Sequence, residues 1–344
     1  MEKTVKSKTQ NFMGIGEIFE MAGAYQKSAI LKAAVELDVF TKISNGQDSV
    51  EKMASSIGAS ERGVRILLDA LCALGMISKA EDKYQLTKTT DQFFVKDKSS
   101  YMGHTLFSIL TDWEAFGKVA ESVKTGSPAV DMYGAESKVW EDVSKGLIQS
   151  GLMTAAIISD ILGIGDKMQP GVNVLDLACG SGVYGYVLLQ RDSKATVTGI
   201  DWQNVLDLAD KTAKEMGVGD RATFKPGDIL SIDYGDEEFD IALASNILQA
   251  FDPETNRVIL GKIFKALKPG GTLVINDFVP DDNRSKAKTA LNFAVYMLIV
   301  TQGGDAYIFP EFESWLKDTG FHRVAQQRIP VGTTIITAIR PRST

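Results

Sequence analysis

The chain has 344 residues, 44% of them hydrophobic, and a formal net charge of −7, so it is long enough for two domains with well-buried cores. An acidic surface repels phosphate backbones, which argues against nucleic acid as a partner. The two cysteines (Cys72, Cys179) and two histidines (His104, His322) lie at no metal-ligand spacing, which excludes a disulfide framework and a metal site and favours a reducing compartment.

The amino-terminal residues 1–10 are polar, and no apolar segment follows them, so no signal peptide is expected. The most apolar long stretch, residues 290–300, is much shorter than the ~20 residues that cross a bilayer. We therefore expect a cytoplasmic protein that has no membrane partner.

Helical signals dominate the first hundred residues. Apolar side chains recur at helical spacing over residues 29–40. Asp48 or Ser49 can cap a second helix. Ser60 can cap a third helix, whose apolar stripe ends at Gly75.

Two short strands, residues 76–78 and 84–86, are predicted to follow around a polar turn. Three helices and a hairpin predict a winged-helix domain over residues 1–105. Winged helices also bind DNA through their third helix, but here that helix is largely apolar and the chain is acidic. Homodimerisation is therefore the preferred function of this domain. Apolar residues near the amino terminus are predicted to pack against the partner subunit: Phe12, Met13, Ile15, Ile18 and Phe19.

Residues 106–168 predict a helical linker, and the main domain boundary is expected near residue 168, where glycine and proline gather. Residues 169–344 then alternate strands and helices, which predicts a Rossmann-like, doubly wound α/β sheet. The expected strands are residues 172–177, 196–200, 223–225, 241–244 and 272–276. Two further runs, residues 324–329 and 333–339, predict a closing antiparallel pair.

The first strand of this sheet runs into a glycine turn at Gly180 and Gly182. Glycine lets a ligand approach bare backbone at the start of a helix. The next strand ends at Asp201, whose carboxylate can accept hydrogen bonds from two ribose hydroxyls. The pattern therefore predicts a nucleoside-binding site.

A dinucleotide is the competing ligand, because Gly180, Gly182 and Gly185 also match the nicotinamide-binding fingerprint. Two acids favour a methyl donor instead. Asp176, on the strand itself, suits an ammonium group rather than a pyrophosphate, and Asp228 suits the exocyclic amine of an adenine. S-adenosylmethionine is therefore preferred over NAD.

With these motifs in place, residues 12–340 resemble the class I methyltransferases of the small-molecule O-methyltransferase family. Members join a winged-helix dimerisation domain to a Rossmann-like donor domain. The matching segments are residues 175–182, 201–205, 227–229, 245–253, 267–271, 303–307, 315 and 320–321.

The resemblance implies S-adenosylmethionine as cofactor and assigns most of its binding residues. They are Gly180 and Gly182 at the amino-acid end, Asp201 at the ribose, Trp202 beside the adenine, Asp228 and Ile229 around the base, and Ser245 at the polar edge.

The chain departs from the family where many relatives carry a histidine as general base, four residues after Ser245. Gln249 stands there, and glutamine does not titrate near neutrality. A well-placed base contributes about 10²–10⁴-fold to a rate. We interpret Gln249 as a neutral residue that orients the acceptor.

Three explanations of the missing base stay open. The acceptor can be acidic or nucleophilic enough to need none, or another group can take the proton, with Asp252, Asp112, His104 and Tyr296 as candidates. The donor can also serve a non-methylating reaction, as in relatives that resemble hydroxylases, decarboxylases or pericyclases.

The acceptor is predicted to be a small, flat, largely apolar molecule, aromatic or polyketide-like. O-methylation is favoured over N- or C-methylation, and an NAD-dependent oxidoreductase or a DNA-binding regulator is a weaker alternative. The expected acceptor-site residues come from the middle helices, from the strand end and from i, i+4 pairs on a late helix: Trp113, Phe116, Met153, Asn246, Asn292, Phe293, Tyr296 and Met297.

Overall fold

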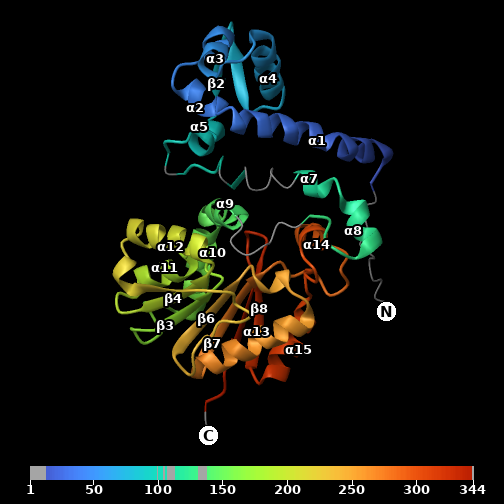
Figure 1. Ribbon diagram of the computed structural model, residues 1–344. Helices are drawn as coiled ribbons and strands as arrows, with labels where there is room; N and C mark the ends of the chain where they lie inside the picture. Colours follow the sequence, from blue (N-terminus) through green and yellow to red (C-terminus); the bar gives the residue numbers. More distant parts are fainter. Residues whose placement is uncertain (1–12, 99, 104, 107–112, 131–137, 343–344) are drawn as a thin grey trace, which may run out of the picture. The chain divides into compact units, whose positions relative to one another are not determined.

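The computed structural model describes residues 13–98, 100–103, 105–106, 113–130 and 138–342 (Figure 1). The chain forms two compact units, residues 1–110 and 111–344. The helices of the segment expected to be a linker therefore belong to the same unit as the large sheet.

The first unit contains the expected helices and hairpin. The side chains of Ser49 and Ser60 accept hydrogen bonds from Lys52 N and Gly63 N and cap the second and third expected helices. Its elements are α1 (Ile15–Glu36), α2 (Val39–Ser44), α3 (Val50–Ile57), α4 (Glu61–Ala73), β1 (Ile77–Ala80), β2 (Lys83–Leu86) and α5 (Lys88–Phe94).

The prediction for the first helix was wrong in its bounds. α1 begins at Ile15, much earlier than expected, and the helix expected to continue to residue 40 is interrupted at Asp38. Asp38 has a φ of 57°, in the left-handed region, which separates α1 from α2. The early part of α1 was missed because its apolar side chains, such as Phe19, are exposed and follow no buried stripe.

The second unit is built on a seven-stranded sheet with the order β5-β4-β3-β6-β7-β9-β8 (Figure 1). The first five strands are parallel, whereas β9 runs antiparallel to both β7 and β8. The expected doubly wound sheet and its closing pair are thus confirmed. The strands are β3 (Asn173–Leu177), β4 (Thr196–Asp201), β5 (Ala222–Pro226), β6 (Phe239–Ser245), β7 (Leu267–Asp277), β8 (His322–Arg328) and β9 (Thr334–Ile339).

Helices cover both faces of this sheet, and alternate strand residues fill two cores. Leu175 and Leu177 pack with residues of α13 and α15, whereas Val174 packs with residues of α10 and α11. The helices are α7 (Trp113–Phe116), α8 (Val119–Thr125), α9 (Lys138–Gly146), α10 (Ile148–Leu162), α11 (Val183–Arg191), α12 (Gln203–Glu215), α13 (Pro253–Ala266), α14 (Lys288–Val300) and α15 (Phe309–Thr319).

The strand order places β3 between β4 and β6, so the chain leaves this central strand in both directions. In doubly wound sheets the crevice at the carboxyl ends of such strands is where ligands bind. In the described part of the chain, no helix has the length and apolarity to cross a membrane.

Candidate active site

The glycine turn after β3 is held in shape by left-handed backbone and by Asp201. Ala178, Gly180 and Gly182 have φ values of 49°, 57° and 78°. The Asp201 carboxylate accepts the N–H of Gly180 at 2.9 Å and that of Trp202 at 2.8 Å. The turn therefore brings bare backbone and a carboxylate together beside the start of α11.

Asp201 is mostly buried, and this burial raises its pKa to about 6, while the two main-chain N–H groups act in the opposite direction. The carboxylate is therefore ionised at neutral pH and poised to accept hydrogen bonds. An ionised acceptor forms stronger hydrogen bonds than a neutral one.

Asp176 is buried beneath the glycine turn and bonds to the main chain of α11. It is 1% exposed, its carboxylate accepts the N–H of Gly185 at 3.1 Å, and burial raises its pKa well above the ordinary value. This geometry anchors α11 to β3. The expected contact of Asp176 with an ammonium group stays a prediction, since Asp176 is absent from the described lining of the cavity in front of the turn.

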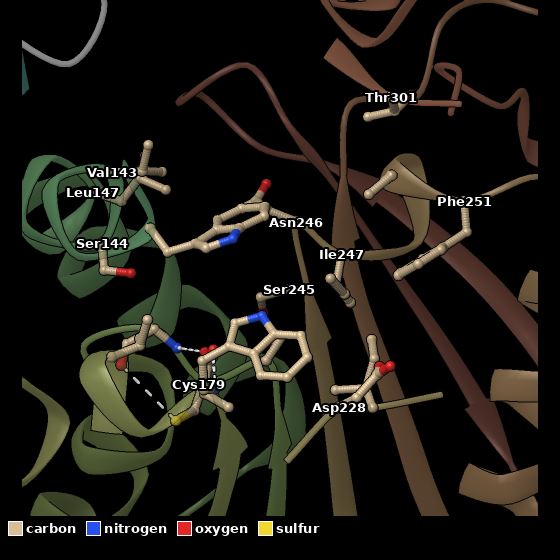
Figure 2. A pocket seen from close by; sticks show the side chains of 18 of the residues that line it. Val143, Ser144, Leu147, Cys179, Asp228, Ser245, Asn246, Ile247, Phe251 and Thr301 are labelled. Carbon is tan, nitrogen blue, oxygen red and sulfur yellow. Dashed lines mark hydrogen bonds between the residues drawn. The ribbon is translucent and has the colours of Figure 1, made fainter. Parts of the chain in front are cut away.

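That cavity has a volume of about 750 Å³ and lies at the carboxyl ends of the central strands. Figure 2 shows Val143, Ser144 and Leu147 on one wall, Ser245 and the two residues after it in the centre, and Phe251 and Thr301 on the opposite side. The walls away from the glycine turn are largely apolar, which suits a flat apolar molecule.

The cavity brings together seven of the residues expected to bind donor or acceptor: Gly180, Asp201, Trp202, Asp228, Ile229, Ser245 and Asn246. Gly182 lies at the edge of this group as the N-cap of α11. These placements agree with the donor orientation that the resemblance implies, and the individual roles stay predictions.

Neither of the two expected catalytic residues is part of the described cavity lining. Gln249 is 6% exposed, and its Nε2 donates to the main-chain oxygen of Asn246 at 3.3 Å. Asp252 is the N-cap of α13, accepts the N–H groups of Glu254 and Thr255 at 2.9 Å each, and has a lowered pKa because of these hydrogen bonds. A carboxylate engaged in this way is a weak base. His104 and Asp112, also candidate bases, lie outside the described residues.

Most of the expected acceptor residues do not line the cavity: Trp113, Phe116, Met153, Asn292, Phe293, Tyr296 and Met297 are absent from its described lining. Met153 is 61% exposed on α10, whereas Met297 is buried. The Phe116 ring stacks on Tyr296 with a centroid distance of 5.9 Å, so these aromatic residues pack against one another. Helical spacing correctly placed residues 292–297 on one helix, α14, but did not predict the direction in which their side chains face.

A large part of the cavity wall was not expected from the sequence. It comprises Trp140, Val143, Ser144 and Leu147 around α9, Ile247 and Phe251 after β6, and Val300 and Thr301 at the end of α14. Phe251 lies two residues after Gln249 and could have been found from that motif. No sequence signal marks α9 as part of the site, because it reaches the cavity only through tertiary packing.

The described residues fit a cationic nucleoside. Two carboxylates, Asp201 and Asp228, line the cavity and would repel a pyrophosphate but attract an ammonium or sulfonium group. Trp202 and Ile229 supply flat or apolar surface for a base, and the buried Ser245 Oγ has no partner among the described residues and can serve a ligand. No group of acids, histidines and cysteines in the described ranges is arranged to hold a metal ion.

Comparisons with known proteins agree with this site. A methyltransferase domain family matches residues 168–319, and the O-methyltransferase dimerisation domain family matches residues 19–96. A solved Nostoc punctiforme protein named as an O-methyltransferase is 31% identical, with a TM-score of 0.86 over 96% of this chain and 100% of its own.

Two curated relatives from Streptomyces cover nearly the whole chain. The tetracenomycin polyketide synthesis 8-O-methyl transferase TcmO of Streptomyces glaucescens is 25% identical over 96% of this chain and 98% of its own length. The L-tyrosine C(3)-methyltransferase of Streptomyces lavendulae is 26% identical over 92% of this chain and 88% of its own length.

The fold and the site therefore define a class I S-adenosylmethionine-dependent methyltransferase. Within that class, the chain belongs to the O-methyltransferase family that carries an N-terminal dimerisation domain. It is a methyltransferase, and S-adenosylmethionine is its methyl donor.

The raised pKa of Asp201 predicts a pH-dependent donor site. Below pH 6 the carboxylate becomes protonated and loses its charge and part of its capacity to accept hydrogen bonds. We expect the affinity for S-adenosylhomocysteine to fall by about tenfold between pH 8 and pH 5, measured by calorimetry. In Asp201→Ala this dependence should disappear; a pH dependence that survives the substitution would assign it to another group.

Proposed function

We propose that the protein transfers the methyl group of S-adenosylmethionine to a hydroxyl oxygen of a small, flat, aromatic or polyketide-like natural product. The observation that carries the proposal is that one cavity is lined both by the glycine turn, which Asp201 holds in shape, and by the apolar side chains of Val143, Leu147 and Phe251. TcmO, a relative over nearly its full length, is named for O-methylation in polyketide synthesis and supports the same acceptor class.

The bound donor supplies an electrophilic methyl carbon on a positively charged sulfur. The residues of this chain orient the acceptor: apolar side chains around the cavity exclude water and fix the plane of the ring. Alignment of this kind is worth roughly 7–11 kcal/mol of barrier reduction. Much of the catalysis is therefore positioning, which requires no titratable side chain at position 249.

Calorimetric titration with S-adenosylhomocysteine tests the donor part of the proposal. We expect a single site per chain, and no heat of binding at millimolar ligand would contradict it. NADH and a promoter DNA fragment serve as comparison ligands. Binding of NADH in place of S-adenosylhomocysteine would favour an oxidoreductase, and salt-sensitive DNA binding would favour a regulator.

C-methylation is the second candidate, because the L-tyrosine C(3)-methyltransferase matches nearly the whole chain. An electron-rich ring carbon needs no strong base before attack, which agrees with glutamine at position 249. N-methylation and a non-methylating use of the donor are further alternatives of the same fold. Mass spectrometry of the product with labelled donor separates them by the atom that carries the label.

We also propose that the protein is a homodimer formed through the N-terminal unit. Two further parts of the proposal are that this unit is a winged helix and that the protein is cytoplasmic. The support is a strongly exposed apolar face on α1: Ile15 and Phe19 are 71% and 72% exposed, and Met21 and Tyr25 follow on the same helix. Exposed apolar surface of this kind marks interaction sites.

Phe19→Glu is expected to convert the dimer to a monomer, because a carboxylate would have to be buried in the apolar interface. Light scattering after size-exclusion chromatography measures the mass. Lys27→Glu is the matched control, since it changes the charge at an exposed polar position of the same helix and should leave the dimer intact. A dimeric Phe19→Glu protein would place the interface elsewhere.

Gln249→His tests whether proton removal limits turnover. If proton removal does not limit turnover, an imidazole at this position should raise the rate of S-adenosylhomocysteine formation at pH 7 by less than tenfold. A gain of tenfold or more would show that the wild-type enzyme lacks an effective proton acceptor.

A further inference from the structure

Unpartnered polar atoms gather where β6 and β7 end. Four buried side-chain oxygens in this region accept no hydrogen bond among the described residues: Ser245 Oγ, Asn246 Oδ1, Gln249 Oε1 and Asp277 Oδ2. Buried polar atoms are rarely left without partners, and each exception calls for an explanation such as a ligand or a bound water. Ser245 and Asn246 line the cavity, so the cluster extends from the cavity wall into the protein.

Asp277 is the ionisable member of the cluster. It is the last residue of β7, is 1% exposed, and directly follows Asn276, which pairs with Ser245 in the sheet register. Its Oδ1 accepts the N–H of Phe278 at 2.7 Å, and the main-chain N–H of Gln249 also faces the carboxylate. Asp277 therefore lies one layer behind the wall formed by residues 245–251.

The surroundings of Asp277 favour its neutral form. Burial raises its pKa to about 7, and only the two main-chain N–H groups oppose this. Tyr307 is the titratable side chain that interacts with it from the segment before α15, and the Tyr307 hydroxyl donates to the main-chain oxygen of Phe251 at 2.6 Å. The remaining charged groups around Tyr307 are carboxylates: Asp252, Asp305 and Glu311. A carboxyl group in this setting can exchange a proton near neutrality.

We propose that Asp277 accepts the hydroxyl proton of the methyl acceptor, through one water molecule bound by the unpartnered oxygens of Ser245 and Gln249, and so replaces an imidazole base at position 249. The inference rests on the proposed O-methylation. A buried water requires two to four hydrogen-bond partners, and the four unpartnered oxygens of this cluster are enough to supply them.

The step balances in atoms and charge. The acceptor oxygen bonds the methyl carbon while the bond of that carbon to the donor sulfur breaks, and the sulfur keeps the electron pair as a neutral thioether. The hydroxyl proton moves to the water, and a proton of that water moves to Asp277 Oδ2. One positive and one negative charge are thereby neutralised.

The pH–rate profile of Asp277→Asn tests this role with 2-naphthol and 1,3-dihydroxynaphthalene as probes. In the wild type the rate should rise with pH through about 7, because only the ionised carboxylate accepts a proton. The rate of Asp277→Asn at pH 8 should be at least tenfold lower than that of the wild type, and it should no longer rise with pH through about 7. Asp210→Asn is the control, because Asp210 is an exposed carboxylate paired with Lys214. It should keep the wild-type rate at pH 8 and the rise of the rate with pH.

A more acidic probe separates proton transfer from a structural role. 4-Nitrophenol ionises near neutrality, so its methylation at pH 8 should be equal in the wild type and Asp277→Asn. Gln249→His should restore at least tenfold activity towards 2-naphthol in the Asp277→Asn background, because it supplies an imidazole. The proposal would be contradicted if Asp277→Asn lost as much activity towards 4-nitrophenol as towards 2-naphthol, or if Gln249→His restored no activity towards 2-naphthol.

Infrared difference spectroscopy gives a readout that is independent of turnover. The wild type should show a protonated carboxyl band that titrates near pH 7 and is missing in Asp277→Asn. Absence of that band, or no turnover of either naphthol by a protein that binds S-adenosylhomocysteine, would overturn the inference while leaving the donor site intact. Failure to bind S-adenosylhomocysteine would instead overturn the proposed function.

Discussion

Asp201→Ala is expected to weaken the binding of S-adenosylhomocysteine by 10-fold to 100-fold, on the order of 1.4–2.8 kcal/mol. We propose that the carboxylate accepts hydrogen bonds from the ribose hydroxyls, and hydrogen bonds to a charged group are worth about 1.5–3 kcal/mol. The substitution also releases the N–H of Gly180, which Asp201 holds at 2.9 Å, so the turn itself should loosen.

Calorimetry at pH 8 measures this effect, because Asp201 is then ionised in the wild type. Asp207→Asn is the matched control, since Asp207 lies on the following helix α12 and pairs with Gln203 at 2.8 Å outside the cavity lining. An affinity of Asp201→Ala equal to that of the control would remove Asp201 from the donor site.

Gly182→Ala is expected to destabilise the second unit and to abolish donor binding. A Cβ at Gly182 would lie 2.1 Å from the buried Tyr186 ring, and the φ of 78° is unfavourable for a side chain. Left-handed backbone costs about 1–2 kcal/mol and overpacking about 1–3 kcal/mol. The melting temperature should therefore fall by roughly 5–15 °C for a unit of this size.

Gly217→Ala separates the two contributions. Gly217 has a similar φ of 72°, but no atom lies within 4 Å of the position that its Cβ would take. It should show the backbone cost alone, with a smaller fall in melting temperature and unchanged affinity for S-adenosylhomocysteine. Equal losses in both variants would contradict the close packing of the glycine turn on Tyr186.

The sheet could be predicted from the sequence because its central parallel strands, such as β3 and β6, are largely buried on both faces. The run at residues 241–244 is continuously apolar, and residues 172–177 are rich in aliphatic side chains, which places both strands within a few residues. The donor end of the site followed from the same logic, since Asp201 and the glycine turn are local to two strand ends.

The cavity wall formed by helical residues could not be predicted, because it depends on which way helices face after packing. Residues 292–297 show helical pairs in the sequence, but only the structure shows that Phe116 stacks on Tyr296 and that the end of α14 supplies Val300 to the cavity. Asp277 was missed for a related reason. An acid at a strand end resembles Asp201 in sequence, and only its burial and its unpartnered Oδ2 distinguish it.

The central claim is that the glycine turn and Asp201 form the site of a sulfonium nucleoside. A crystal structure of the protein grown with S-adenosylhomocysteine tests it most directly. The ribose hydroxyls are expected within hydrogen-bond distance of the Asp201 carboxylate, and the adenine is expected beside Trp202. A ligand bound elsewhere, or side chains filling this cavity under saturating ligand, would contradict it.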